Sequence, residues 1–221
     1  MKKAVLSWSG GKDSMLTLRE LQRSGKYEVG TLLTTITEGY NRISMHGVRT
    51  LLLEKQAESL RIRLHKVYIP NDANNETYEK NMIDALAMYP ALDVKEIAFG
   101  DVYLEDVKEY REKLIGRTRL ASVYPIWKRD TKELISEFID EGYKAVTVCI
   151  DTKKLPDSFL GRDLDNDFIN DLPAGVDPCG ENGEYHTFVY DGPGFREPVK
   201  FETGEKVQRG EFGFVDLVTI G

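Results

Sequence analysis

The sequence predicts an α/β fold with a mostly parallel sheet and flanking helices. Short apolar runs rich in Val, Ile, Leu and Thr alternate with longer amphipathic stretches over about the first 150 residues, which is typical of βαβ units. The first apolar run ends in a loop with two glycines, directly before a helical pattern. Beyond residue 150 the chain becomes rich in Asp, Gly, Asn and Pro. These observations predict a sheet domain followed by a smaller α+β region.

The spacing of apolar residues places the elements of the first part. In the first helical pattern, Met15, Leu18 and Leu21 recur on one face, and Gly25 supplies a helix stop. Strands are expected at residues 3–7, 29–36, 64–69, 96–99, 121–124 and 145–150. Helices are expected at residues 14–23, 48–60, 76–88, 104–115 and 131–141.

The last third of the chain is expected to be different. Residues 151–196 read as a loop-dense stretch with one short helix at 164–172, and such a stretch usually folds over a site. Short antiparallel strands are expected at residues 198–201, 206–209 and 214–220, with turns at Gly204 and Gly210. We therefore divide the chain into residues 1–150, the main domain, and 151–221, a C-terminal region.

Composition limits the classes of partner. The chain has 221 residues, 41% hydrophobic and 30% charged, which predicts a chain that folds throughout. A net charge of −7 argues against a nucleic-acid backbone as the main ligand. Cys149 and Cys179 form no Cys-x-x-Cys pair that would indicate zinc or iron–sulfur. Because no segment resembles a signal peptide or a membrane span, we expect a cytoplasmic protein.

The loop Ser9-Gly10-Gly11-Lys12-Asp13-Ser14 has the chemistry of a phosphate site. Glycines allow positive φ and close backbone approach, and amide groups at a helix start bind anions. Lys12 adds a positive charge, while Ser9 and Ser14 add hydroxyl donors. The order of residues matches neither the Walker A nor the Rossmann pattern. A glycine-rich turn that only connects a strand to a helix is the competing interpretation.

This loop resembles the pyrophosphatase loop (PP-loop) of the N-type ATP pyrophosphatases. The resemblance implies an adenine nucleotide alpha hydrolase-like, Rossmann-like fold, ATP as the nucleotide, cleavage between the α and β phosphates, and a loop that grips pyrophosphate with Mg²⁺. Because Mg²⁺ prefers oxygen ligands, we expect Asp13 to act on it directly or through water. Asp101 and Asp130 are weaker candidates for the same nucleotide and metal site.

Three further segments point to one branch of that superfamily. Residues 175–191, which include Gly-Glu-Asn-Gly-Glu-Tyr-His-Thr, resemble the signature of the diphthine–ammonia ligase family. His186 stands where that pattern usually has Glu, so the contact of that carboxylate cannot be transferred. Residues 155–165 resemble the Leu-Gly-Arg element of the family, and residues 125–130 resemble its Pro-Leu-Trp-x-Arg-Asp element. Together with the PP-loop, these segments span nearly the whole chain.

The chemistry of such a ligase assigns roles to its charged residues. A carboxylate and ATP must be brought together, so Lys12, Arg129 and Arg162 are expected to clamp negative groups. Glu181 and Glu184 are expected to hold ammonium or to take a proton as ammonia attacks. His46 follows the second predicted strand, at the edge where ligands bind in parallel sheets. The remaining candidates, for contact with the acceptor substrate, are Trp127, Gly161, Tyr185, His186 and Thr187.

Several of these residues have structural alternatives. Asp130 precedes a helix and is at least as well explained as an N-cap. Trp127 could be a core residue, and Tyr185 is equally open between core and site. Arg162 could form a surface ion pair with its neighbours Asp163 or Asp165. Two residues outside the candidate set, His65 and Cys149, are interpreted as structural. Cys179 lies in the signature segment, where the sequence identifies no partner for its thiol.

The resemblance implies adenylation of an acceptor carboxylate, followed by attack of ammonia to give an amide and AMP. In the eukaryotic and archaeal family the acceptor is diphthine on elongation factor 2. The sequence leaves open a bacterial branch of unknown substrate, a small-molecule acceptor and a homodimer. Two other functions also remain open: a PP-loop enzyme that modifies RNA or a small molecule, and a sensor that binds ATP without turnover.

Overall fold

The computed structural model describes residues 1–39, 42–43 and 47–220. The chain forms two compact units. Unit 1 comprises Met1–Ser9, Asp13–Ser44 and Ile62–Lys128, and unit 2 comprises Gly10–Lys12, Met45–Arg61 and Arg129–Gly221. Both units contain segments from distant parts of the sequence, so each is described by itself.

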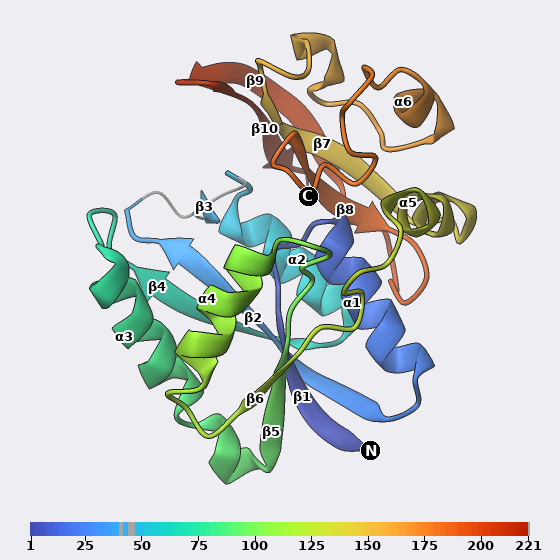
Figure 1. The fold of residues 1–221 in the computed structure, drawn as a ribbon. Helices are drawn as coiled ribbons and strands as arrows, with labels where there is room; N and C mark the ends of the chain where they lie inside the picture. Colours follow the sequence, from blue (N-terminus) through green and yellow to red (C-terminus); the bar gives the residue numbers. More distant parts are fainter. Residues whose placement is uncertain (40–41, 44–46, 221) are drawn as a thin grey trace. The chain divides into compact units, whose positions relative to one another are not determined.

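A mostly parallel sheet forms the centre of unit 1 (Figure 1). Its strands follow the order β3-β2-β1-β5-β6, and β4 pairs with β2. Strand β1 runs parallel to β2 and β5, β2 to β4, and β5 to β6, whereas β3 is antiparallel to β2. The strands are β1 (Lys2–Ser7), β2 (Tyr27–Thr37), β3 (Arg42–Ile43), β4 (Arg63–Ile69), β5 (Val94–Ala98) and β6 (Ala121–Val123).

Amphipathic helices accompany this sheet. Helix α1 (Lys12–Arg23) buries Met15, Leu16, Leu18 and Leu21, and Gly25 adopts φ +62° just beyond its end. Figure 1 shows α3 (Asn75–Leu86) and α4 (Glu105–Ile115) side by side. Their apolar faces join strand residues in one buried cluster of Val5, Leu33, Val67, Ile69, Met82, Leu86, Tyr89, Ile97, Phe99, Leu114, Ile115 and Leu120.

Unit 2 contains an antiparallel sheet in the order β8-β7-β10-β9. Its strands are β7 (Lys144–Asp151), β8 (Tyr185–Asp191), β9 (Phe201–Arg209) and β10 (Phe212–Thr219). Its helices are α2 (Thr50–Leu60), α5 (Thr131–Asp140) and the short α6 (Asn166–Asn170). Aromatic residues supply much of its core: Phe138, Phe168, Tyr185 and Phe188 are fully buried.

The α/β class and the expected helices are confirmed, while three strand predictions and one turn prediction need correction. The strand at 145–150, expected in the parallel sheet, pairs antiparallel with β8 and β10 as part of β7. Residues 198–201 and 206–209 do not give two strands, because β9 runs continuously from 201 to 209. Gly204 is therefore not at a turn but lies where the pairing register of β9 with β10 shifts, as glycine often does at a bulge. Strands β3 and β8 were not among the expected elements.

No helix in the described part of the chain combines the length and the apolar character needed to cross a bilayer.

Candidate active site

The predicted phosphate loop lies between the end of β1 at Ser7 and the start of α1 at Lys12. The division of the chain passes through this loop: Gly10–Lys12 belong to unit 2, whereas Ser9, Asp13 and Ser14 belong to unit 1.

Strand β8 holds the backbone of the Gly10–Lys12 segment. The Gly10 carbonyl accepts a hydrogen bond from Val189 N at 2.9 Å, and Lys12 N donates to Thr187 Oγ1 at 3.1 Å. The buried Gln56 of α2 donates through Nε2 to the carbonyls of Gly10, at 3.0 Å, and Val189, at 2.5 Å. The signature strand and α2 thus fix the conformation of the loop backbone.

This packing leaves room only for glycine at position 10. Gly10 has φ +77°, and a Cβ there would lie 2.5 Å from Leu53 Cδ2 and 3.0 Å from Gln56 Oε1. Both the backbone conformation and the close approach of α2 exclude a larger residue. The glycine predicted for phosphate binding is therefore also required by the packing of unit 2.

The charge of Lys12, at the end of this segment, acts on His186 of strand β8. Lys12 is only 2% exposed, and its Nζ lies 5.1 Å from the centre of the Tyr185 ring. Burial, and to a smaller extent the charge of Lys12, lower the pKa of His186 to about 4, although the nearby Glu184 acts to raise it. His186 is consequently neutral near pH 7 and adds no charge of its own beside Lys12.

Tyr185 has the first of the two roles that the sequence left open, that of a core residue. Its side chain is fully buried and packs edge-to-face on Phe168, with 5.1 Å between ring centres. Its hydroxyl donates to the carbonyl of Pro178, at the start of the signature loop. Tyr185 is therefore a core residue whose ring also lies under the Lys12 ammonium group.

Asp177 organises the signature loop. Its Oδ1 accepts hydrogen bonds from the backbone N–H groups of Cys179, at 2.9 Å, and Glu181, at 3.2 Å. Its Oδ2 accepts from Thr131 Oγ1 at 2.8 Å. Cys179 is fully buried, and its Sγ donates to the Thr131 carbonyl at 3.2 Å. These bonds connect the loop to the first residue of α5.

Glu184 is a buried carboxylate bound by its own loop. It is 1% exposed and accepts hydrogen bonds from Asp177 N at 3.3 Å, Asn182 N at 2.9 Å and Asn182 Nδ2 at 3.1 Å. Burial acts to raise the pKa of Glu184, but the hydrogen bonds and the charge of Lys154 outweigh it, so the pKa is lowered. Glu184 is thus ionised, and its observed contacts organise the loop; its role toward ammonia stays a prediction.

The predicted arginine clamps and Asp130 have structural partners in unit 2. Arg129 pairs with Glu137 of α5 at 2.6 Å. Arg162 pairs with Asp171 at 2.9 Å, and not with Asp163 or Asp165, which corrects that alternative. Asp130 caps α5 by accepting from the backbone N–H groups of Lys132 and Glu133, at 2.8 and 3.1 Å, which confirms the N-cap interpretation.

Gly161, beside Arg162, has φ +80° and donates its N–H to the Thr147 carbonyl at 2.9 Å. Its positive φ explains the glycine of the Leu-Gly-Arg element by backbone conformation. Its expected contact with an acceptor stays a prediction.

In unit 1, the first turn of α1 packs against the segment after β5. A Cβ on Gly100 would lie 2.9 Å from both the Asp13 carbonyl oxygen and Thr17 Oγ1. The adjacent Asp101 pairs with Arg111 at 2.8 Å. Burial raises the pKa of Asp101, Arg111 lowers it, and the charge of Asp13 adds to the increase. Two of the three predicted Mg²⁺ carboxylates, Asp13 and Asp101, therefore interact electrostatically.

These carboxylates fit the oxygen preference of Mg²⁺ but do not form a complete metal cage. Within residues 1–39, 42–43 and 47–220, no group of three or more His, Cys, Asp or Glu side chains is placed to hold a metal. Mg²⁺ is commonly bound by one or two carboxylates together with substrate phosphates. Asp13 and Asp101 suit that mode of binding, in which the nucleotide completes the coordination.

Trp127 is not the core residue of its segment. The neighbouring Ile126 is fully buried, whereas Trp127 is partly exposed. The ammonium groups of Lys108 and Lys128 lie 5.5 and 5.9 Å from its ring centre. Two of the predicted site residues lie in the phosphate loop and bind each other: Ser9 Oγ donates to Ser14 Oγ at 3.3 Å. The last predicted site residue, His46, lies outside the described residues.

The structural interpretations of His65 and Cys149 are confirmed. His65 Nδ1 lies 2.7 Å from the Tyr89 hydroxyl within unit 1. Cys149 is buried, and burial together with Asp151 raises the pKa of its thiol to about 12.

The sequence did not predict Gln56, Thr131 and Asp177 as residues that organise the site. Gln56 had one signal, a polar residue within the apolar pattern of α2.

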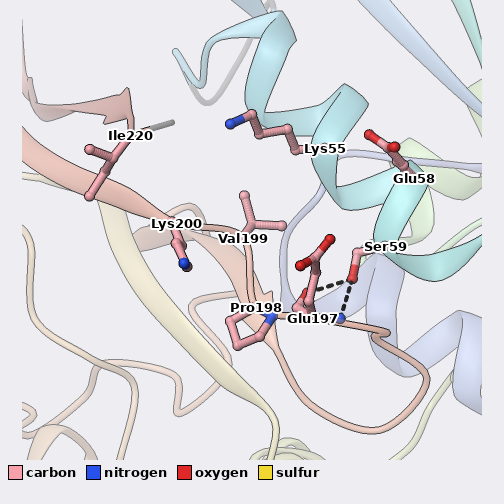
Figure 2. Close-up of a pocket in the computed structure, with 8 residues that line it drawn as sticks. All are labelled: Lys55, Glu58, Ser59, Glu197, Pro198, Val199, Lys200 and Ile220. Atoms are coloured by element: carbon pink, nitrogen blue, oxygen red, sulfur yellow. Dashed lines mark hydrogen bonds between the residues drawn. The ribbon is translucent and has the colours of Figure 1, made fainter.

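A separate pocket in unit 2 lies along α2, lined by Lys55, Glu58, Ser59, Glu197, Pro198, Val199, Lys200 and Ile220. Figure 2 shows Ser59 joined to Glu197: its hydroxyl donates to the Glu197 carbonyl at 2.5 Å and accepts from Glu197 N at 3.1 Å. None of the predicted site residues lines this pocket.

Comparisons with known proteins cover almost the whole chain. The N-terminal domain model of diphthamide synthase matches residues 1–122, and the C-terminal domain model matches residues 130–220. A Homo sapiens protein named diphthine–ammonia ligase is 26% identical, over 90% of this chain and 82% of its own length. Relatives of the same name from Bos taurus and Danio rerio are 25% and 27% identical, over 95% and 75% of this chain and 86% and 66% of their own lengths. The chain therefore belongs to the diphthamide synthase family.

Proposed function

We propose that this protein is an ATP-dependent, amide-forming ligase of the diphthine–ammonia ligase type. The observation that carries the proposal is the hydrogen bonding of Gly10 and Lys12 to Val189 and Thr187. It fastens a loop with phosphate-binding chemistry to the strand that carries the family signature. A loop that merely connected β1 to α1 would not need this fixed backbone.

Bound ATP supplies an adenylyl group that activates the acceptor carboxylate with release of pyrophosphate, and ammonia then displaces AMP to leave an amide. Lys12 binds negative phosphate oxygens, and the neutral His186 beside it adds no negative charge that would repel them. Asp13 and Asp101 would hold Mg²⁺ together with the nucleotide phosphates, and the ion would neutralise part of the negative charge of those phosphates. Residues 1–150 bind ATP, and residues 151–221 contribute the acceptor region.

The acceptor region uses the remaining charged side chains. Arg129 and Arg162 orient the acceptor carboxylate, since a guanidinium group holds a carboxylate in a bidentate manner. Glu181 takes a proton from the attacking ammonia. Its backbone is fixed by Asp177, which is the kind of support that positions a catalytic group. The acceptor is contacted or surrounded by the remaining predicted residues, which are Trp127, Gly161, Tyr185, His186 and Thr187.

The acceptor is a carboxylate, and the name of the relatives, diphthine–ammonia ligase, supports diphthine as that acceptor. A matched pair of substrates tests this proposal: elongation factor 2 carrying diphthine, and the same protein without the modification. AMP and pyrophosphate are quantified with and without an ammonium salt. Formation of AMP that requires both diphthine and ammonium supports the proposal, whereas ADP as the product contradicts cleavage between the α and β phosphates.

The variant Lys12→Ala tests the nucleotide site, with Lys95→Ala as the matched control. Lys12 is 2% exposed at the predicted phosphate loop, whereas the Lys95 side chain is 81% exposed in a surface pair with Asp93. Loss of one charged contact to a phosphate in a desolvated site is expected to lower kcat/KM for ATP by about a hundredfold or more. The control should retain full activity, and a fully active Lys12→Ala would overturn the loop assignment.

A further inference from the structure

We propose that Asp177 is a positioning residue that orients Glu181 by tying the signature loop to the start of α5 through Thr131. The inference deepens the proposed function and rests on it for its catalytic consequence. Neither Asp177 nor Thr131 was among the residues expected at the site, and the hydrogen bonds of unit 2 bring them together.

Asp177 uses all of its polar groups within this region. One carboxylate oxygen gathers the N–H groups of Cys179 and Glu181, and the other accepts from the Thr131 hydroxyl. Its own N–H donates to Glu184, and its carbonyl accepts from Gly180 N at 2.8 Å. Asp177 thus binds the loop through both its side chain and its backbone, from Cys179 to Glu184.

The backbone of the loop makes this arrangement specific. Gly180 has φ +64°, and a Cβ there would lie 2.7 Å from Tyr185 Cδ1. Gly183 has φ +80°, and its N–H donates to the Gly180 carbonyl at 3.0 Å. Glu181 lies inside the turn that Gly183 closes on the Gly180 carbonyl, and its own N–H is held by Asp177. Asp177 and this turn therefore set the backbone from which the Glu181 side chain projects.

Thr131 connects this loop to a separate sequence element. It is the first residue of α5 and follows Arg129 and the N-cap residue Asp130. Thr131 binds the loop twice, because its hydroxyl donates to Asp177 and its carbonyl accepts from Cys179 Sγ at 3.2 Å. These two bonds join the start of α5 to the loop that carries Glu181.

A double-mutant cycle between Thr131→Val and Glu181→Gln tests the proposal. Thr131→Val removes the hydroxyl and retains the backbone carbonyl that accepts from Cys179. We expect it to lower kcat for amide formation by about tenfold, since small misplacement of a catalytic group is costly, and to leave the KM for ATP unchanged. Thr131→Ser keeps the hydroxyl and should restore kcat.

If Thr131 acts through Glu181, Thr131→Val should cause no further loss in the Glu181→Gln background. Additive losses in kcat would overturn the proposal, and so would equal losses in Thr131→Val and Thr131→Ser. Melting temperatures of all variants identify a general loss of structure, which would change stability without producing this coupling.

A second readout does not depend on the ligase activity. In a Cys149→Ser background, the rate at which a thiol reagent labels Cys179 reports opening of the loop, because Cys179 is fully buried and lies beside Asp177. Asp177→Ala should raise this rate by about tenfold or more, and Thr131→Val should raise it to a smaller extent. If the wild-type protein forms no AMP, the proposed function fails while labelling still tests the structural clamp. An unchanged labelling rate in both variants would overturn that clamp.

Discussion

Replacing Gly10 by alanine tests how strictly unit 2 holds the phosphate loop. Gly10 has φ +77°, a left-handed conformation that costs a residue with a Cβ about 1–2 kcal/mol. The added Cβ would lie 2.5 Å from Leu53 Cδ2 and 3.0 Å from Gln56 Oε1, and such overpacking typically costs about 1–3 kcal/mol. Together these effects oppose the native loop by about 2–5 kcal/mol.

Gly25→Ala is the matched control, because Gly25 has φ +62° and no atom within 4 Å of an added Cβ. It should lose only the conformational contribution of about 1–2 kcal/mol. Urea unfolding gives the change in unfolding free energy for both variants, and isothermal titration gives their affinities for ATP. We expect Gly10→Ala to bind ATP at least about tenfold more weakly than the wild type, whereas Gly25→Ala should retain its affinity.

The contact with Leu53 also predicts a rescue. Leu53→Ala creates space in front of position 10, so the loss of stability in the double variant should be smaller than the two single losses combined. Equal unfolding free energies for Gly10→Ala and Gly25→Ala, with unchanged ATP affinity in both, would refute the packing argument.

Two further predictions concern His186 and Gly100. The pKa of His186 is lowered to about 4, so the unfolded chain binds a proton that the folded state binds only at lower pH. The free energy of unfolding should therefore decrease as the pH falls from about 6.5 toward 4. Urea unfolding should show a shallower decrease for His186→Gln, and an identical slope would contradict the assignment. Gly100→Ala should lower the unfolding free energy by about 1–3 kcal/mol, because its Cβ would meet the Asp13 carbonyl oxygen at 2.9 Å; unchanged urea midpoints would contradict this prediction.

The elements of unit 1 could be predicted because their signals are local. Apolar spacing in α1 and the glycine at position 25 indicate where that helix lies and ends. The strand at 145–150 shows the limit of this approach. Six of the eight residues of β7 are buried, so the strand reads like one of a parallel sheet. Only its partners β8 and β10, far along the chain, determine that it is antiparallel.

Strand β8 was missed because its neighbours in sequence suggest a loop. Pro178, Gly180 and Gly183 precede it within a few residues, and these residue types are typical of turns. The strand is stabilised by pairing with β7 and by burial of Tyr185, Phe188 and Val189. Both contributions depend on tertiary structure and leave little trace in the local sequence.

The sequence could predict candidate residues for the site, but not which partners most of them bind. The N-cap role of Asp130 follows from its position before a helix and needs no tertiary information. Arg162, in contrast, bypasses the nearby Asp163 and Asp165 and pairs with Asp171, because the intervening chain folds into α6. Likewise, no short-range pattern connects Thr131 with Asp177, which are separated by 46 residues.

The hydrogen bond from Lys12 to Thr187 has a consequence for how the protein matures during synthesis. The two residues are 175 positions apart, so ribosomes must make the whole of β8 before the loop backbone finds its partners. A nascent chain that has completed only the parallel sheet carries every residue of the phosphate loop without the strand that shapes it. Such long-range closure is slow to form, so ATP binding should arise only after the signature strand has been added.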